Sequence, residues 1–333
     1  MRIAIIGTGA LASLFAARLS AVAELDTSVM TEVVMVGSWP AQIEAVQANG
    51  LTLLEMNGRS SIHPIAITNK PHMVAPVDVA LVLVKSYQTQ TAVSRIQPLL
   101  SPNGLVVTLQ NGVGNVEILR AGLDTAAVTV GVTALGATMV KPGVVSHAGE
   151  GPVHLAPPPI PHQYFLPLVE LFQQAGFAAE VAEDGDSLVW GKLAINTGIN
   201  PLTAVLNVPN GYLADHEDVC ALMMAAAQET AVVAAAQAIQ LPYPDASARV
   251  LAVAQATAPN RSSMLQDLDR GSRTEIDAIC GAVVKIGREV GVETAVNRQL
   301  LSWIKTIESG EVLTDLRIKI SGSVMDLTNH RQL

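Results

Sequence analysis

A glycine-containing loop close to the N-terminus constrains the fold of this chain more than any other feature. Arg2–Gly7 is a short, mostly β-branched run that predicts a buried parallel strand, and Ser13–Ser20 predicts a helix. Between them lies Gly7-Thr8-Gly9-Ala10-Leu11-Ala12, which matches the dinucleotide-binding fingerprint with alanine in place of its third glycine. Such glycines permit a tight turn and let the backbone approach a pyrophosphate, while the helix N-terminus offers N–H groups. We therefore predict that these six residues bind a dinucleotide; the alternative is a turn that serves packing alone.

The second strand bears on the choice of cofactor. Glu32–Val36 predicts a strand, and Gly37, Ser38 and Trp39 follow at its carboxyl end. An acidic residue here would bind the ribose hydroxyls of NAD, whereas a basic residue would accommodate the 2′-phosphate of NADP. The chain has neither, but the Ser38 hydroxyl can donate to a phosphate and no carboxylate at this position repels one. The sequence therefore favours NADP(H) over NAD(H).

Two further polar residues follow predicted buried strands. Lys85 follows Val77–Val84, and Asn111 follows Leu105–Gln110 on a glycine-bearing loop. Open α/β sheets bind their ligands at the carboxyl ends of the strands, so both side chains are candidates for the site. For Lys85 the alternative is an ordinary solvated lysine.

The second half of the chain differs from the first. A rigid connection at Pro157–Pro161 and a turn at Glu183–Asp186 precede a region where strand patterns largely stop. We therefore predict an α/β domain at residues 1–183, with a Rossmann-type doubly wound parallel sheet, and an all-α domain at residues 184–333. The alanine-rich run Ala221–Ala238 suits burial between helices or a homodimer contact. Helices are expected at residues 186–197, 219–239, 244–257, 272–289 and 297–309.

Composition narrows the classes of function. The net charge of −9 argues against a nucleic-acid partner, but local cations could still hold a small anionic substrate. Cys220 and Cys280 lack metal-ligand spacing, and His147 and His154 lie without clustered ligands, so we expect no metal site. Arg2 is followed by too few apolar residues for a secretory signal, and longer apolar stretches are interrupted. We therefore expect no membrane span and a cytoplasmic location.

A row of polar residues opens the second domain. Lys192, Asn196 and Asn200 are spaced i, i+4 and i+8 in a predicted helix, which places them on one face. One lysine and two amides suit an oxyanion or a carboxylate. The alternative is a polar face turned to solvent.

A second polar segment follows in the same domain. Asn260 with Ser262 or Ser263 indicates a helix N-cap, and N–H groups at such an end also suit a carboxylate. Glu275 lies among residues that we predict to be helical. The alternative to a site role for Glu275 is a surface ion pair, for example with Arg273.

Five segments together resemble a known family. In chain order they are GTGALASLFAARL, VLVKSYQT, LQNGVGN, WGKLAINTGINPLTA and NRSSMLQDLDRGSRTEID, and they resemble the ketopantoate reductases (2-dehydropantoate 2-reductases). The resemblance covers nearly the whole chain and is weakest between about residues 38 and 75 and after residue 310. It implies a Rossmann domain followed by an all-helical domain, as in 6-phosphogluconate-dehydrogenase-like reductases, with the active site in the cleft. It also implies NADPH-dependent reduction of ketopantoate to pantoate, a step of pantothenate and coenzyme A synthesis.

The resemblance also implies a role for each candidate residue. Lys192 matches the general acid that protonates the developing alkoxide, and Glu275 matches the acidic partner expected beside substrate, cofactor and lysine. The other matches are binding positions: Asn196, Asn200 and Ser263 for the substrate with Asn260 beside them, Asn111 between cofactor and substrate, and Lys85 near the adenosine or ribose. There are two departures from the family pattern, Ala12 for glycine and Ser38 where many members have an arginine for the 2′-phosphate. The second leaves the choice between NADPH and NADH open.

These residue types suit the implied chemistry. Reduction of a 2-keto acid needs a proton donor at the carbonyl oxygen, and desolvation lowers the pKa of a lysine toward the working pH. Two alternatives stay open at this point: reduction of another branched 2-keto acid on the same fold, and a non-catalytic NADPH-binding sensor. A β-hydroxyacid dehydrogenase of the related superfamily would show a different pattern of lysine and asparagine.

Overall fold

The protein, seen here as a computed structural model, is described at residues 1–25, 31–123, 127–313, 315–320 and 323–330. Its backbone packing divides the chain into two compact units. The first unit consists of Met1–Gln110 and Asn115–Gly185, and the second of Asn111–Gly114 and Asp186–Leu333. The main division lies close to the expected boundary at residue 183. The assignment of the short loop Asn111–Gly114 to the second unit was not expected.

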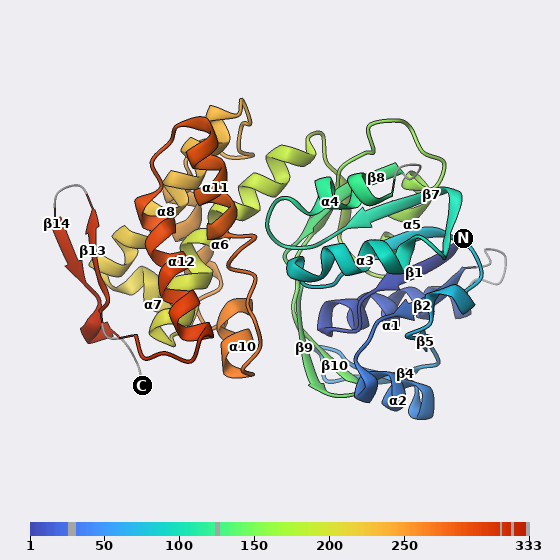
Figure 1. Ribbon diagram of the computed structural model, residues 1–333. Coiled ribbons are helices and arrows are strands. Elements are labelled where there is room, and N and C mark those ends of the chain that lie inside the picture. The colour runs from blue at the N-terminus through green and yellow to red at the C-terminus, as the bar shows by residue number, and fades with distance from the viewer. Residues whose placement is uncertain (26–30, 124–126, 314, 321–322, 331–333) are drawn as a thin grey trace. The chain divides into compact units, whose positions relative to one another are not determined.

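An eight-stranded sheet forms the centre of the first unit (Figure 1). Its strands are β1 (Arg2–Ile6), β2 (Glu32–Val36), β5 (Ala66–Thr68), β6 (Val77–Val82), β7 (Leu100–Thr108), β8 (Ala127–Thr133), β11 (Val153–Leu155) and β12 (Ala179–Val181). The order is β12-β11-β8-β7-β6-β1-β2-β5, and all neighbours from β5 to β8 are parallel. The chain builds outward from β1 to β5, then returns to β6 and builds the other way. This reversal confirms the predicted doubly wound sheet.

Helices cover both faces of this sheet. They are α1 (Ala10–Leu25), α2 (Pro40–Asn49), α3 (Thr89–Ile96), α4 (Asn115–Gly122) and α5 (Phe165–Gln174), with 3-10 turns at Pro71–Met73 and Ser86–Gln88. Successive side chains of a strand point to opposite faces. In β1, Ile3 and Ile5 join the core that contains α1 and α5, whereas Ala4 and Ile6 join the core that contains α3 and α4. The central strands therefore need apolar residues on both faces, as the buried stretch Ile3–Ile6 of β1 has.

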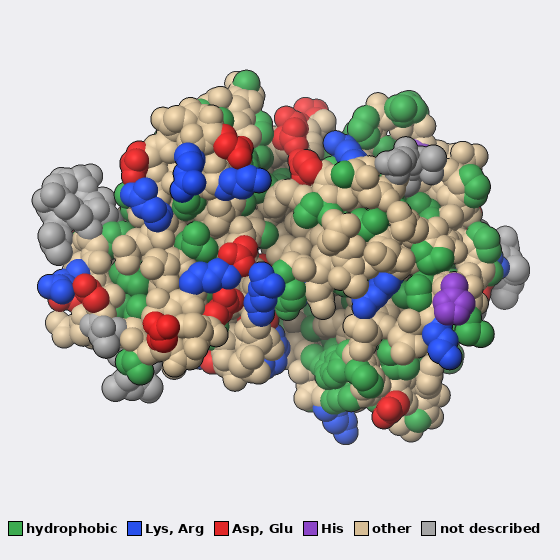
Figure 2. Space-filling model, viewed as in Figure 1, with side chains coloured by type: hydrophobic (Ala, Val, Ile, Leu, Met, Phe, Trp, Pro, Cys, Tyr) green, Lys and Arg blue, Asp and Glu red, His purple; other side chains and the backbone are tan. Residues whose placement is uncertain are grey.

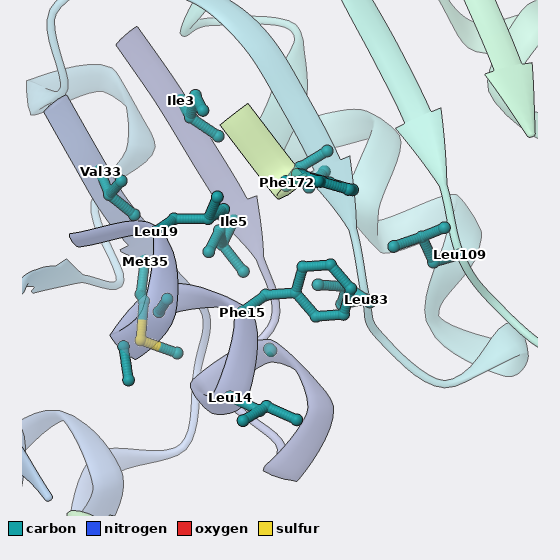
Figure 3. Close-up of a cluster of buried hydrophobic side chains, with 14 of the residues drawn as sticks. Ile3, Ile5, Leu14, Phe15, Leu19, Val33, Met35, Leu83, Leu109 and Phe172 are labelled. Atoms are coloured by element: carbon teal, nitrogen blue, oxygen red, sulfur yellow. The ribbon is translucent and has the colours of Figure 1, made fainter. Parts of the chain in front are cut away.

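Aromatic side chains fill the layer between the sheet, α1 and α5. Figure 3 shows Phe15 of α1 beside Ile5 of β1, with Phe172 of α5 in the same cluster. The Phe15 ring stacks on Phe177 at a centroid distance of 4.4 Å and meets Phe172 edge-on at 5.3 Å. This packing fixes α1, and therefore the loop that precedes it, against the sheet.

A smaller sheet lies against α1. Its strands are β3 (Leu51–Leu54), β4 (Ser60–His63), β9 (Gly136–Lys141) and β10 (Val144–Gly149), in the order β4-β3-β10-β9. The strand β9 was not predicted from the sequence. Four residues of β9 are half-buried and two are exposed, so its sequence carries no clear alternation.

The second unit is mainly helical. Its helices are α6 (Gly185–Leu206), α7 (Asn210–Asp215), α8 (Glu217–Ala236), α9 (Ala246–Ala256), α10 (Ser263–Asp269), α11 (Cys280–Val290) and α12 (Ala295–Glu308). The predicted helical domain is confirmed, with local corrections. α7 has no counterpart among the predicted helices. α6 continues beyond Thr197 through Pro201, the helix predicted over residues 272–289 begins only at Cys280, and an antiparallel pair follows α12. That pair is β13 (Arg317–Ile320) with β14 (Ser323–Asp326), followed by a 3-10 turn at Thr328–His330.

α8 lies at the centre of the helical unit and packs against α7, α9, α11 and α12 (Figure 1). Among the described helices it alone has the length and hydropathy of a membrane span. Its polar side chains nevertheless make contacts inside the unit. Thr230 Oγ1 lies 2.9 Å from Thr197 Oγ1, and the Glu229 carboxylate accepts the N–H groups of Val296 and Asn297 at 2.8 and 2.9 Å. These are the contacts of a core helix, and the absence of a membrane span stays a prediction.

Candidate active site

The fingerprint loop lies at the carboxyl edge of the large sheet, where the strand order reverses. Gly7 has a φ of +140°, and a Cβ there would lie 3.0 Å from the carbonyl oxygen of Leu83. The Gly7 N–H donates to the Val36 carbonyl at 2.9 Å. Gly9 is exposed, and a Cβ there would meet nothing within 4 Å. The sheet therefore fixes the loop at Gly7 and leaves the backbone at Gly9 open to a ligand.

α1 begins directly at Ala10, as the fingerprint requires. The Gly9 carbonyl accepts the first helical hydrogen bond, from the Ser13 N–H at 2.9 Å. The N–H groups of the first turn, including that of the half-buried Leu11, are the ones that a helix offers to an anion. Ala12 is fully buried in the core, so a methyl group fits where the fingerprint usually has glycine.

Ser38 lies at the same edge of the sheet, after β2. Its side chain is exposed, Trp39 beside it is 39% exposed, and α2 begins at Pro40 without an acidic residue in its first turn. A Cβ at Gly37 would lie 2.4 Å from the methyl group of Thr8, so a larger residue there would displace the Thr8 side chain. Residues 37–39 and the first turn of α2 contain no carboxylate that could repel a 2′-phosphate.

A buried polar network, which the sequence analysis missed, holds the loops after β6 and β7. Gln110 Nε2 donates to Thr89 Oγ1 at 2.8 Å and to the Val84 carbonyl at 3.1 Å, and Thr89 Oγ1 lies 2.8 Å from Asn115 Oδ1. The half-buried Lys85 directly follows Val84, so the network holds the backbone beside it. The available signal was a glutamine that ends an apolar strand, since a buried amide needs partners.

The three polar residues of the second domain lie on one continuous helix, α6. Lys192 and Asn196 are half-buried and Asn200 is only 7% exposed, so the alternative of a face turned to solvent does not hold. Pro201 interrupts the helical hydrogen bonds because it lacks an N–H. Thr203 supports the turn instead, and its hydroxyl lies 3.0 Å from two carbonyl oxygens of the preceding turn.

The start of α10 contacts the end of α6. Ser262 is the N-cap, because its Oγ accepts a backbone N–H of the first turn at 3.1 Å; it also lies 2.7 Å from Thr203 Oγ1. The predicted cap is therefore confirmed at Ser262. Ser263 and Asn260 have exposed side chains, and the Asn260 carbonyl accepts the Asn210 N–H at 2.9 Å. Ser263 thus lies next to the contact that joins α10 to α6.

Glu275 lies in an irregular segment between α10 and α11, so its predicted place on a helix is wrong. The chain leaves α10 through Gly271, whose φ is +62°, and α11 begins only at Cys280. Glu275 is only 6% exposed, which does not fit a surface ion pair. Its Oε2 accepts a hydrogen bond from Asn111 Nδ2 at 3.2 Å.

The loop Asn111–Gly114 packs closely on the segment that carries Glu275. The Val113 N–H donates to the Ala278 carbonyl at 3.2 Å. Gly112 has a φ of +81°, and a Cβ there would lie 2.3 Å from the same carbonyl oxygen. Glycine at this position lets the loop come close enough for Asn111 to reach Glu275, although the two residues are 164 positions apart.

Electrostatics single out Lys192 within the second unit. Burial lowers the pKa of Lys192 to about 8, and the charge of the Glu275 carboxylate opposes part of that shift. An ammonium group with this pKa is charged at neutral pH and can still give up its proton to a developing alkoxide. The structure therefore brings Lys192, Glu275 and Asn111 into one electrostatic group, with Asn196 and Asn200 on the lysine's helix.

The two cysteines and His147 lie in surroundings that suit a packing role. Burial raises the pKa of the Cys220 and Cys280 thiols. His147 is 2% exposed, and its Nδ1 lies 3.0 Å from Glu55 Oε2. Within the described ranges, no cluster of three or more His, Cys, Asp or Glu side chains is arranged for a metal ion. A cavity of about 370 Å³ beside Glu308 has none of the candidate residues in its wall.

Comparison with known proteins gives the following matches. The family model described as "Ketopantoate reductase PanE/ApbA" matches residues 3–159, and "Ketopantoate reductase PanE/ApbA C terminal" matches residues 185–308. The 2-dehydropantoate 2-reductase of Archaeoglobus fulgidus is 35% identical over 311 residues, which cover 93% of this chain and 98% of the relative. The solved PanE/ApbA family ketopantoate reductase from Ralstonia eutropha JMP134 has a TM-score of 0.84 at 31% identity and covers 93% of this chain and 99% of its own. A D-mandelate dehydrogenase with NADH and anilino(oxo)acetate has a TM-score of 0.84 over 93% of this chain and 99% of its own, and at 24% identity it shows a shared fold alone.

Proposed function

This chain belongs to the ketopantoate reductase family, and from that premise we propose that it reduces 2-dehydropantoate (ketopantoate) to pantoate with NADPH, a step of pantothenate synthesis. One observation carries the proposal. Lys192, with a pKa lowered to about 8, is acted on by the buried Glu275 carboxylate, which Asn111 contacts at 3.2 Å. Reduction of a carbonyl group needs a proton donor, and a lysine with this pKa can supply the proton at neutral pH.

The first unit is proposed to hold the nicotinamide nucleotide. The N-terminus of α1 and the open backbone at Gly9, where a Cβ would meet nothing within 4 Å, fit a pyrophosphate. Thr8, Ala10, Leu11 and Ala12 complete this loop. Lys85, which follows the neighbouring strand β6, is proposed to lie near the adenosine or ribose of the cofactor. When bound, the reduced nicotinamide supplies the hydride for the carbonyl carbon.

Proton transfer is proposed to start from Lys192. Its ammonium group stabilises the negative charge that develops on the substrate oxygen and then protonates it, so that the keto group becomes a secondary alcohol. The neutral amine regains its proton from solvent. Glu275 favours the charged lysine, and the Asn111 amide orients the Glu275 carboxylate.

The remaining polar side chains are proposed to bind the substrate. Asn196 and Asn200 follow Lys192 at one-turn intervals, so their amides can bind the hydroxyl and carboxylate oxygens of a keto acid whose carbonyl meets the lysine. Ser263, in the first turn of α10, and Asn260 before it add donors suited to a carboxylate. Amides and hydroxyls orient these groups without adding charge.

We propose NADPH over NADH because of the turn after β2. Ser38 is exposed, and the first turn of α2 has no acidic residue, so a 2′-phosphate would meet no repulsion here. A carboxylate at this position would instead bind the ribose hydroxyls of NADH. The preference is measured by initial rates with each cofactor across a range of concentrations. Equal kcat/KM values would show that Ser38 does not discriminate.

A substrate panel tests the function. We expect loss of 340 nm absorbance when the purified protein is mixed with NADPH and ketopantoate. The matched comparison is 3,3-dimethyl-2-oxobutanoate, which lacks only the hydroxyl group and should react with a kcat/KM at least about tenfold lower. Equal values would indicate another branched 2-keto acid as the substrate. No oxidation with any keto acid would contradict the proposed reaction and favour a nucleotide sensor.

The proposed setting is the cytoplasm, with a small keto acid as the partner and neither nucleic acid nor membrane. The net charge of −9 argues against a nucleic-acid partner, as do the intermixed basic and acidic side chains on the face of the helical unit in Figure 2. A homodimer stays an open alternative, which light scattering on the purified protein would decide.

A further inference from the structure

The carboxylate of Glu275 is presented by a segment without regular structure. Residues 271–279 form turns and irregular backbone between α10 and α11, and within them the Glu275 carbonyl accepts the N–H groups of Ala278 and Ile279 at 3.0 and 3.1 Å. Yet Glu275 is only 6% exposed and accepts a hydrogen bond from Asn111 at 3.2 Å. These turn bonds lie on the C-terminal side of Glu275, so the contacts of Thr274 decide how its N-terminal side is held.

The last turn of α12 supplies one such anchor. Glu308 Oε1 accepts two hydrogen bonds from Thr274, one from the backbone N–H and one from the hydroxyl, each at 2.7 Å. Thr274 directly precedes Glu275 and is 1% exposed, so both of its donors depend on this carboxylate oxygen for a partner. The Thr274 hydroxyl oxygen in turn accepts the Ile276 N–H at 3.2 Å. The two neighbours of Glu275 are thus fixed through Glu308.

The same turn of α12 contacts the segment on the far side of Glu275. Lys305 Nζ donates to Glu308 Oε2 at 3.1 Å and to Asp277 Oδ2 at 2.6 Å, and Arg273 also donates to Asp277 Oδ2, at 3.0 Å. Partial burial lowers the pKa of Lys305, but the hydrogen bonds to Asp277 and Glu308 outweigh it, so its pKa is raised. Lys305 therefore stays charged and joins the two acidic side chains into one network.

We propose that Glu308 is a positioning residue that holds the Glu275 carboxylate, through Thr274, in the place from which it acts on Lys192. The role of Lys192 and Glu275 in turnover rests on the proposed function, but the geometric claim does not. Glu308 acts through hydrogen bonds to the backbone and hydroxyl of Thr274, so an uncharged acceptor oxygen at the same position should largely replace it. Among the described residues, Glu275 is the charged group that acts on Lys192.

Competitive acetylation tests the claim without turnover. The rate of Lys192 acetylation, followed by mass spectrometry across pH, reports the pKa of its amine. In wild type the midpoint should lie at about 8. Glu308→Ala frees the Glu275 segment and should move the midpoint lower, because the carboxylate that favours the charged lysine is displaced. Glu308→Gln keeps an acceptor oxygen for Thr274 and should give a midpoint close to wild type.

The kinetic readout should move in parallel. With ketopantoate, Glu308→Ala should lower kcat/KM by up to about 100-fold and shift its alkaline fall to lower pH, whereas Glu308→Gln should recover most of the rate. The control is Glu293→Gln, which removes a surface ion-pair carboxylate 2.7 Å from Arg298 in the same unit and should leave both readouts unchanged. Thr274→Val, which removes the hydroxyl donor and keeps the shape, serves if Glu308→Ala does not fold.

The outcomes separate this claim from the proposed reaction. A wild-type acetylation profile in folded Glu308→Ala, or in Thr274→Val if the first variant does not fold, would overturn the positioning role. Equal losses in Glu308→Ala and Glu308→Gln would also overturn it, because they would show that the charge acts directly. If the acetylation midpoint shifts as expected but wild type does not oxidise NADPH with ketopantoate, the positioning role stands and the proposed reaction fails.

Discussion

The pH dependence of turnover follows directly from the surroundings of Lys192. Burial lowers its pKa from 10.5 to about 8, with Glu275 opposing part of the shift. If Lys192 is the proton donor, activity requires its charged form. About nine-tenths of the enzyme should carry that form at pH 7 and about one-tenth at pH 9, whereas an unperturbed lysine would stay almost fully charged at pH 9.

The assay is kcat/KM for ketopantoate at saturating NADPH between pH 6 and pH 10 in a buffer of constant ionic strength. This parameter reports groups of the enzyme that is free of keto acid. We expect a plateau at low pH, a midpoint at about 8, and a fall of about tenfold per unit above it. A level profile up to pH 10 would refute the reasoning, because the donor would then have an ordinary lysine pKa or be another group.

The same shift predicts an effect on stability. The pKa of Lys192 is lower in the folded state than the unfolded value of 10.5, so folding disfavours the charged form. The cost is largest below pH 8 and disappears as the pH rises through about 8 toward 10.5. At pH 7 it amounts to about 1–3 kcal/mol. Lys192→Met should therefore raise the free energy of unfolding in urea at pH 7 and have little effect near pH 10; a loss of stability at pH 7 would contradict the desolvation argument.

Three further substitutions test other parts of the account. Gly112→Ala should lower the free energy of unfolding, measured in urea, by about 2–4 kcal/mol. Gly114 is also at positive φ but has open space around it, so Gly114→Ala should lower it by only about 1–2 kcal/mol. Equal losses would exclude the contact with Ala278 as the cause. Glu229→Ala removes the carboxylate that accepts two N–H groups of α12 and should cost about 2–3 kcal/mol by the same measurement; a change below about 0.5 kcal/mol would mean that water replaces it. Ser38→Asp should raise the KM for NADPH about tenfold or more and leave that for NADH nearly unchanged, as measured by initial rates; an unchanged NADPH value would place the 2′-phosphate elsewhere.

Local sequence was enough to predict much of the first unit. β1 and β2 are runs of β-branched and apolar residues with core on both faces, and such runs identify buried parallel strands. The strand at Arg2–Ile6, the tight turn at Gly7 and the helix from Ala10 follow from glycine conformation and helix-end chemistry, which act within a few residues. For the same reason, the spacing of Lys192, Asn196 and Asn200 on α6 could be predicted.

Features that depend on distant contacts could not be predicted in this way. Glu275 was assigned to a helix because its neighbours suit one, but Gly271 and the hydrogen bonds from Thr274 to Glu308 give the segment another conformation. The packing of Gly112 on Ala278 joins residues far apart in the chain, so no local pattern indicates that Asn111 lies with the second unit. α6 also continues through Pro201, where a proline usually marks the end of a helix.

The central claim is that Lys192 donates the proton in an NADPH-dependent reduction of ketopantoate. The most direct measurement compares wild type with Lys192→Met for loss of 340 nm absorbance with NADPH and ketopantoate, together with NADPH affinity by fluorescence titration. We predict steady oxidation by wild type, a loss of about 10²–10⁴-fold in kcat for the variant, and equal NADPH affinity. Turnover of the variant within a few-fold of wild type would contradict the claim.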